Sequence, residues 1–139
     1  MRVVLDTGIF VSALITKDTP PDILYNGWRD RQFDLVTSLA QMDELERVLT
    51  YKKLQRYISR NEAILILNTL GACAEVLEAI PQVNLSPDPD DNKIIATAMA
   101  GTVDYLVTGD KKDLLSLENV EGVSIVTARK AVGILNLID

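Results

Sequence analysis

Short apolar segments alternate with longer segments of helical character along the whole chain, and this alternation constrains the fold most. The expected strands are residues 3–5, 33–37, 74–80, 104–108 and 123–126. The expected helices are residues 9–15, 20–30, 39–49, 54–58, 62–73, 89–101, 113–117 and 128–135. Strands that alternate with helices predict a parallel sheet covered by helices on both faces. Such sheets bind ligands beyond the carboxyl ends of their strands, near a change in strand order.

The length and composition are typical of one soluble globular domain. The chain of 139 residues shows neither a repeat nor a linker, so residues 1–139 are expected to form a single domain. No apolar run approaches the roughly 20 residues that span a bilayer, and the first residues lack a secretory signal, so we expect a cytoplasmic protein. Cys73 is the only cysteine, which excludes an intramolecular disulfide and a cysteine metal cluster. Its apolar helical surroundings predict a small core residue.

The charge balance limits the chemistry that the chain can perform. It has 14 basic and 20 acidic residues, a formal net charge of −6, and no histidine. An acidic surface disfavours nucleic acid, but a metal held by converging carboxylates would cancel part of their charge locally. Without histidine, we expect the chemistry to use carboxylates and a metal that they hold. The basic residues gather in three places, which we interpret as solvated helix faces: Lys52, Lys53, Arg56 and Arg60; Lys111 and Lys112; Arg129 and Lys130.

Two aspartates lie where expected strands end. Asp6 follows the apolar run 3–5, and Asp110 follows the strand expected at 104–108. Carboxylates repeated at strand ends predict one acidic pocket built from distant segments. Each aspartate also has a structural alternative, because each precedes a helix that it could cap. Asp113 comes three residues after Asp110 and could face the same side.

Asp91 is the acid for which the pattern argues most strongly. The segment 88–91 (DPDD) is a helix start, with Asp88 at the cap and proline in the first turn. Ile94 and Ile95 lie three and four residues after Asp91, so Asp91 falls on the buried stripe of that helix. A buried carboxylate is costly unless it is paired or binds a metal. The pattern therefore predicts a functional Asp91 and a structural Asp88.

The helix expected at 39–49 carries a further acid, but periodicity does not select it. Leu45 and Leu49 lie on its apolar stripe, whereas Glu44 and Glu46 flank the stripe on opposite edges. Asp43 is expected to point to solvent. Either glutamate could face the acidic pocket, and a polar helix face is the structural alternative.

Two of four consecutive motifs resemble the first half of a PIN domain. Residues 3–14 (VVLDTGIFVSAL) resemble the opening strand, aspartate and apolar helix of that family, with Asp6 as the acid and Ser12 on the helix. Residues 44–49 (ELERVL) resemble the helix that carries the second acid of the family, which would be Glu44.

The other two motifs resemble the second half. Residues 88–98 (DPDDNKIIATA) resemble the third motif, with Asp91 as its acid. Residues 105–114 (YLVTGDKKDL) resemble the fourth, with Asp110 as the main acid and Asp113 as an addition. The resemblance covers most of the chain and is nearest to the bacterial PIN proteins that are toxin components of toxin–antitoxin pairs.

The resemblance implies a fold and an activity. The fold would be a three-layer α/β/α sandwich with a five-stranded, mainly parallel sheet. The activity would be Mg²⁺- or Mn²⁺-dependent hydrolysis of RNA that leaves a 5′-phosphate and a 3′-hydroxyl. The implied catalytic residues are Asp6, Glu44, Asp91 and Asp110, and the implied metal ligands are these four and Asp113. Oxygen ligands suit such hard cations, so the residues themselves support this chemistry.

The resemblance also implies binding partners for the chain, and the residues leave alternative functions open. The resemblance implies RNA as substrate, a small antitoxin protein as partner, and a homodimer. Ser12 and Thr108 could orient a water or a phosphate, although a local cap or turn bond would explain either hydroxyl equally well. The alternative function is a non-catalytic PIN-like RNA-binding module. A phosphatase with an aspartate nucleophile would need a second aspartate two residues after Asp6, where the chain has Gly8.

Overall fold

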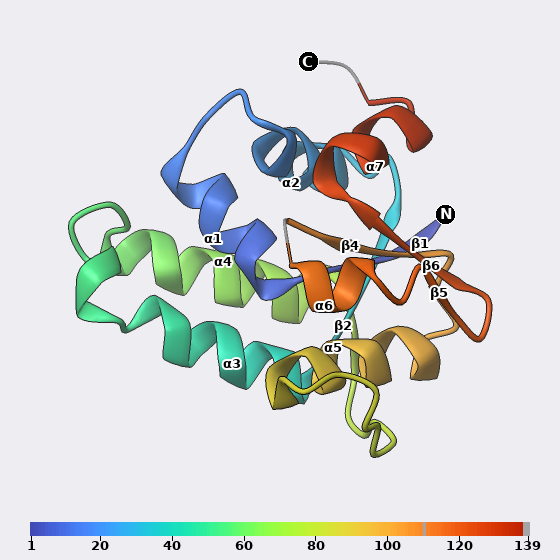
Figure 1. Ribbon diagram of the computed structural model, residues 1–139. Coiled ribbons are helices and arrows are strands. Elements are labelled where there is room, and N and C mark those ends of the chain that lie inside the picture. The colour runs from blue at the N-terminus through green and yellow to red at the C-terminus, as the bar shows by residue number, and fades with distance from the viewer. Residues whose placement is uncertain (110, 138–139) are drawn as a thin grey trace.

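The computed structural model describes residues 1–109 and 111–137, which form a sheet with helices on both of its faces (Figure 1). The strands are β1 (Arg2–Leu5), β2 (Asp34–Ser38), β3 (Glu75–Leu77), β4 (Tyr105–Thr108), β5 (Asn119–Val120) and β6 (Val123–Thr127). The helices are α1 (Thr7–Ile15), α2 (Pro20–Arg29), α3 (Leu39–Leu49), α4 (Arg60–Cys73), α5 (Pro89–Ala100), α6 (Lys112–Leu115) and α7 (Ala128–Ile134), with a 3₁₀ helix, η1 (Lys52–Leu54), between α3 and α4. The predicted α/β/α class is confirmed.

The sheet places β1 and β4 side by side at its centre. The strand order is β3-β2-β1-β4-β6-β5, and every neighbouring pair is parallel except β5 with β6. From β1 the chain builds outward through β2 and β3, and then returns to the other side of β1 with β4 and β6. The order therefore changes direction between β1 and β4. In open α/β sheets, the crevice at the carboxyl ends of two such strands is the usual ligand site.

One short strand adds to the five that were expected. β5 pairs with β6 in antiparallel fashion, with Asn119 opposite Ser124 and Val120 opposite Val123. Between the paired strands, Glu121 and Gly122 have φ angles of 49° and 90°. Two successive positive φ angles are characteristic of the type I′ turn, whose twist suits a two-residue hairpin. Glutamate is not a usual residue at the first of these positions, so the residue pattern of the turn does not predict this hairpin.

Helices cover both faces of the sheet, as predicted. Side chains in a strand alternate between the two faces, so Val3 and Leu5 belong to one core and Val4 to the other. The first core also contains side chains of α1, α2, α3, α4 and α7, and the second contains those of α5 and α6. No helix in the described part of the chain has the length and apolar character needed to cross a membrane.

Side-chain caps fix several helix starts near the site. Ser38 caps α3, as the sequence predicts. Asp88 caps α5, and its Oδ1 accepts the backbone N–H of Asp90 at 2.9 Å. Ser59 and Glu62 form a reciprocal capping box at the start of α4.

Two local predictions were wrong. The helix expected at 54–58 is absent: the described chain forms η1 there, followed by a turn. The N–H of Leu54 donates to the Tyr51 carbonyl at 3.0 Å and that of Gln55 to the Lys52 carbonyl at 3.2 Å. These i to i−3 hydrogen bonds are those of a short 3₁₀ helix. Cys73 is exposed rather than buried. It ends α4, which packs beside the edge strand β3, so this last turn is not covered as a central helix would be.

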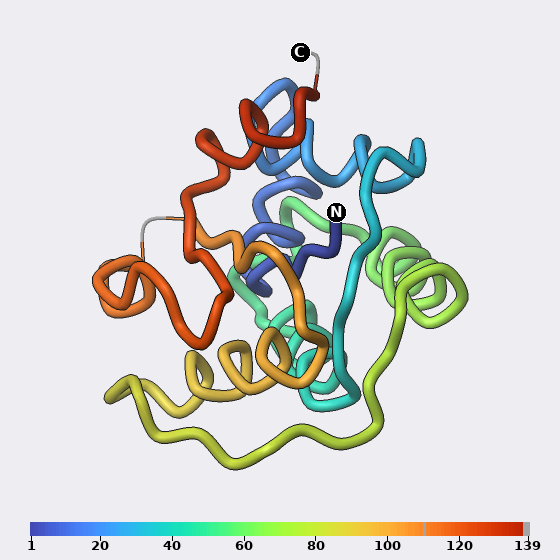
Figure 2. Tube along the Cα trace, turned by 90° about the vertical axis from the view of Figure 1, so that its right-hand side faces the viewer, coloured from blue at the N-terminus to red at the C-terminus, as the bar shows by residue number. Residues whose placement is uncertain are grey.

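The connection from β3 to α5 brings a further side chain to the site. Figure 2 shows this segment, residues 78–88, passing outside α5 in yellow-green. The side chain of Asn92 anchors its end, since Oδ1 accepts the backbone N–H of Ser86 at 2.8 Å and Nδ2 donates to the Ser86 carbonyl at 2.8 Å. Ser86 is thereby held against the first turn of α5.

Candidate active site

The candidate site lies at the carboxyl ends of β1 and β4, where the strand order changes direction. Asp6 directly follows β1, and its backbone N–H donates to the carbonyl of Val107 in β4 at 2.8 Å. Asp91 lies in the first turn of α5, which packs on β1 and β4. Each of the two aspartates is only 2% exposed. The fold therefore brings two carboxylates that are far apart in the sequence into one buried region.

The Asp6 carboxylate is oriented by the end of β4. Asp6 occupies the N-cap position of α1, but its side chain makes no capping hydrogen bond. Its Oδ2 accepts from Oγ1 of Thr108, a fully buried residue, at 3.0 Å. Burial raises the pKa of Asp6 above its ordinary value, although Lys111 and Thr108 act in the opposite direction. The hydrogen bonds of Asp6 are thus those of an oriented carboxylate rather than a helix cap.

The Asp91 carboxylate has a partner on each oxygen. Ser86 Oγ donates to Oδ2 at 3.1 Å, and Lys111 Nζ donates to Oδ1 at 3.1 Å. Because Asp88 provides the side-chain cap of α5, the start of this helix does not explain the burial of Asp91. The structure agrees with the helical periodicity, which places Asp91 on the buried stripe.

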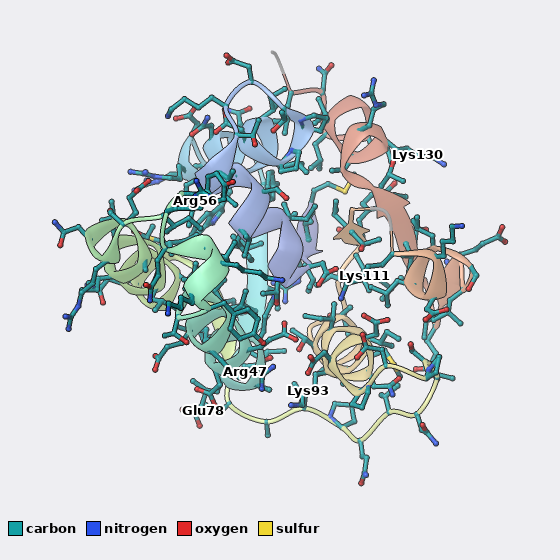
Figure 3. All side chains as sticks on the ribbon, turned by 60° about the vertical axis from the view of Figure 1, so that its left-hand side comes forward. Arg47, Arg56, Glu78, Lys93, Lys111 and Lys130 are labelled. Atoms are coloured by element: carbon teal, nitrogen blue, oxygen red, sulfur yellow. The ribbon has the colours of Figure 1, made fainter. Side chains whose placement is uncertain are left out.

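One ammonium group lies between the two aspartates. Nζ of Lys111 is 3.1 Å from Oδ1 of Asp91 and 3.9 Å from Oδ2 of Asp6. Figure 3 shows Lys111 between α1 and α5. Burial opposes the charge of this side chain, but Asp6 and then Asp91 outweigh it, and the pKa of Lys111 is raised. The two carboxylates therefore already bind one cation jointly.

Glu44, rather than Glu46, faces this region. Glu44 is 8% exposed, and its Oε1 accepts from Oγ1 of Thr7 at the start of α1. Burial raises the pKa of Glu44, and the negative charges of Asp90 and Asp6 act in the same direction. Glu46 is exposed on another side of α3. The choice that periodicity left open is thus resolved by the packing of α3.

Of the other four residues predicted for the site, the structure describes three, and it places only Thr108 in contact with the buried carboxylates. Asp110 lies outside the described residues. Asp113 is exposed on α6. Ser12 is exposed on α1, whereas the Thr108 hydroxyl hydrogen-bonds Asp6, which leaves Thr108 as an orienting residue for that carboxylate.

A groove of about 380 Å³ adjoins the acids, and we call it the α1–α3 groove. It is lined by Thr7, Gly8, Val11, Ser12, Glu44, Val48, Tyr51, Lys53, Leu54, Asp90 and Lys111. A substrate lying in this groove would pass directly over Glu44 and Lys111.

The donors fit a divalent metal ion, although they do not form a complete cage. Within residues 1–109 and 111–137, no group of three or more His, Cys, Asp or Glu side chains is arranged to hold a metal. Mg²⁺ is usually held by one or two carboxylates, and waters and phosphate oxygens complete its shell. Asp6 and Asp91 supply that number, and their shared contact with Lys111 shows that a cation is favourable between them.

Sequence reasoning missed three polar residues of the site. Lys111 was assigned to a solvated face, although it lies within the fourth motif, directly after Asp110. Ser86 is held near Asp91 by the hydrogen bonds of Asn92, and Thr7 is paired with Glu44 from another helix. No sequence periodicity connects these partners.

Fold and site together define an α/β protein with buried carboxylates that bind a cation at the central crevice of the sheet. The family model described as "PIN domain" matches residues 2–112 of this chain. The chain is also similar to "Uncharacterized protein MJ1680" of Methanocaldococcus jannaschii, with 30% identity over 120 residues that cover 86% of this chain and 76% of that protein. The chain belongs to the PIN-domain family, and the predicted resemblance is confirmed. PIN domains are generally nucleases and usually bind divalent metal ions.

Proposed function

We propose that this protein is a Mg²⁺- or Mn²⁺-dependent endoribonuclease. The observation that carries the proposal is the Asp6–Asp91 pair, two carboxylates each 2% exposed that share one cation at the central crevice. Burying two such charges is unfavourable for stability unless they are compensated. A site of this kind is explained best by a function that needs a cation there.

The side chains have separable roles in this proposal. Asp6 and Asp91 hold the ion, with Thr108 and Ser86 fixing the orientation of the two carboxylates. Asp110 is proposed as a further ligand on the resemblance alone. When bound, a divalent ion in such a site polarises a phosphate and lowers the pKa of a coordinated water.

Glu44 and Lys111 are proposed to act on the substrate. Glu44 has a raised pKa, which suits a residue that accepts a proton from the attacking water. The Lys111 ammonium lies at the edge of the α1–α3 groove, where it can pair with a phosphate oxygen of RNA. Because the chain has no histidine, a mechanism based on a histidine pair is excluded, and water attack would leave a 5′-phosphate.

Cleavage of a labelled single-stranded RNA tests the proposal. We expect the purified protein to cut RNA with Mg²⁺ or Mn²⁺, to stop in EDTA, and to release 5′-phosphate ends. Asp6→Asn should be inactive under the same conditions. Equal cleavage by wild type and Asp6→Asn would identify a contaminant, and RNA retention without cleavage by the wild type would identify a binding module.

We also propose, on the resemblance, that the protein is the toxin of a toxin–antitoxin pair and forms a homodimer. The apolar side chains Ile64 and Leu65 on α4 are 46% and 56% exposed and are available for a protein contact. Induced expression should slow bacterial growth, and a small partner protein encoded beside it should restore growth. Normal growth at high expression of folded, active protein would contradict the toxin role but not the nuclease.

A further inference from the structure

An exposed aromatic ring lines the same groove as the acids. Tyr51 is 41% exposed and contributes to the α1–α3 groove together with Lys53 and Leu54. The ammonium of Lys53 lies 6.0 Å from the centroid of the Tyr51 ring. The chemistry proposed for the carboxylates uses none of these three side chains, so their place in the groove needs another explanation.

The backbone holds Tyr51 in a defined position. Its N–H donates to the carbonyl of Val48 at 3.0 Å, and its carbonyl accepts the N–H of Leu54 at 3.0 Å. Leu54 is partly buried against the first core, which anchors the segment. A ring presented on such a fixed backbone loses little conformational entropy when it binds a ligand.

Tyr51 is also close to the catalytic end of the groove. Tyr51 follows Leu49, the last residue of α3, by two residues, and both Tyr51 and Glu44 line the α1–α3 groove. Arg47 connects the two regions: its Nη2 is 3.6 Å from Oδ2 of Asp90, and the Tyr51 side chain raises the pKa of Arg47. A nucleotide that contacts Tyr51 would therefore be a near neighbour of the phosphate at the acids.

A flat ring beside an ammonium group fits one nucleotide of a single strand. Bases stack on aromatic side chains in proteins that bind single-stranded nucleic acid, and basic side chains follow the backbone. We infer that Tyr51 stacks on an unpaired base of the RNA substrate next to the scissile phosphate, and that Lys53 neutralises a backbone phosphate there. The inference rests on the proposed function, because that function supplies the RNA. Since every base has a stacking face, this subsite selects single strands without selecting sequence.

The chain provides a matched control for each side chain. Tyr57 is 55% exposed and has Arg56 5.6 Å from its ring centroid, but it does not line the groove. Lys52 is exposed next to Lys53 and does not line the groove either. Tyr51→Leu can thus be compared with Tyr57→Leu, and Lys53→Ala with Lys52→Ala.

The test is the affinity for a fluorescein-labelled ten-nucleotide RNA, measured by fluorescence anisotropy in EDTA. We expect Tyr51→Leu to weaken binding about tenfold, in the range known for stacked bases, and Tyr57→Leu to change it less than about twofold. Lys53→Ala should reduce the slope of log affinity against log salt by about 0.7, the value for one phosphate contact of a single strand. The Lys52→Ala slope should stay at the wild-type value.

An abasic scan of the same RNA makes the test specific for a base. Removal of one particular base should weaken binding to the wild type but not to Tyr51→Leu. Equal losses for Tyr51→Leu and Tyr57→Leu, or no RNA binding by the wild type, would overturn the subsite. An unchanged affinity of Tyr51→Leu would overturn it too and would assign the exposed ring to a protein partner. EDTA prevents metal-dependent cleavage, so these outcomes do not depend on whether the protein is a nuclease.

Discussion

Lys111 is the residue whose removal should reveal the charge balance of the site. Lys111→Met leaves Asp6 and Asp91 buried without their shared cation. Hydrogen bonds to charged groups contribute about 1.5–3 kcal/mol, and because the Lys111 side chain is 43% exposed, we expect a loss of only about 1 kcal/mol. The measurement is thermal unfolding in EDTA, with a lower melting temperature for the variant. Lys112→Met, at the exposed neighbouring lysine, is the control and should melt with the wild type.

Glu44 should give the metal-free protein a characteristic pH dependence. Its pKa in the folded state is raised by burial and then by Asp90 and Asp6. An acid with a raised pKa binds its proton more tightly in the folded state, so its contribution favours folding at low pH and is lost as the pH rises through the folded-state pKa. Glu44→Gln should therefore be more stable than the wild type at neutral pH in EDTA, and the difference should shrink as the pH falls towards 4.

The control for this pH dependence is Glu46→Gln, on the exposed side of the same helix. It should match the wild type at every pH, because its carboxylate is exposed in both the folded and the unfolded state. If Glu44→Gln and the wild type had the same free energy of unfolding at every pH, the buried charge assigned to Glu44 would be wrong.

Among single residues, the sequence predicts those whose role follows from the periodicity of their own helix or strand. Asp91 was recognisable because Ile94 and Ile95 define the buried stripe of its own helix. Periodicity did not identify Lys111 or Ser86, because the carboxylates that they contact lie on other elements. Periodicity reports which side of an element is buried, but not which distant group meets it.

Between elements, a buried glutamine joins α3 to the end of β1. Gln41 is 2% exposed, and its Nε2 donates to the Leu5 carbonyl at 2.6 Å while its Oε1 accepts from Thr37 at 2.6 Å. Leu5 directly precedes Asp6, so these bonds also fix the strand end that carries the Asp6 carboxylate.

Gln41→Met should destabilise the protein by about 1–3 kcal/mol, because it removes both hydrogen bonds and leaves the buried Leu5 carbonyl without its side-chain donor. Chemical denaturation at neutral pH measures this change in the free energy of unfolding. Gln82→Met, at an exposed position in the connection before α5, should change it by less than about 0.5 kcal/mol. Equal effects would show that the buried bonds contribute little.

Element boundaries were predicted well where side-chain caps mark them and poorly elsewhere. Ser38 and Asp88 cap the helices that the sequence assigned to them. The prediction of a helix at 54–58 was wrong, because a short apolar pattern does not distinguish an α-helix from the 3₁₀ helix and turn that form there. The β5–β6 hairpin was missed, because its turn carries Glu121 at a positive φ that only tertiary structure imposes.

The whole molecule should be stabilised by the metal that its site is proposed to bind. A ligand at a hundredfold excess over its dissociation constant adds about 2.7 kcal/mol, which for a chain of this size corresponds to roughly 10 °C in melting temperature. Mn²⁺ should raise the melting temperature of the wild type and of Asp43→Asn, an exposed position on α3, by similar amounts. Asp6→Asn should gain much less. A similar gain for all three proteins would show that the ion binds elsewhere.

The overall architecture was predictable because several weak signals occur in a fixed order. Alternating strands and helices predict the layered sheet, and acids at strand ends predict the crevice between β1 and β4. The net charge of −6 argued against nucleic acid, but it averages over the surface and does not report that Lys53 and Lys111 line the same groove as Glu44.

The most direct measurement is the single-turnover rate of RNA cleavage with Mn²⁺ by Asp91→Asn and Asp88→Asn. Both variants replace an aspartate by asparagine at the start of α5. Asparagine caps helices as well as aspartate does, so Asp88→Asn should cleave within about twofold of the wild-type rate. Asp91→Asn should lose at least about a hundredfold, or ~2.7 kcal/mol of transition-state stabilisation. Equal rates for the two variants would contradict the catalytic site at Asp6 and Asp91.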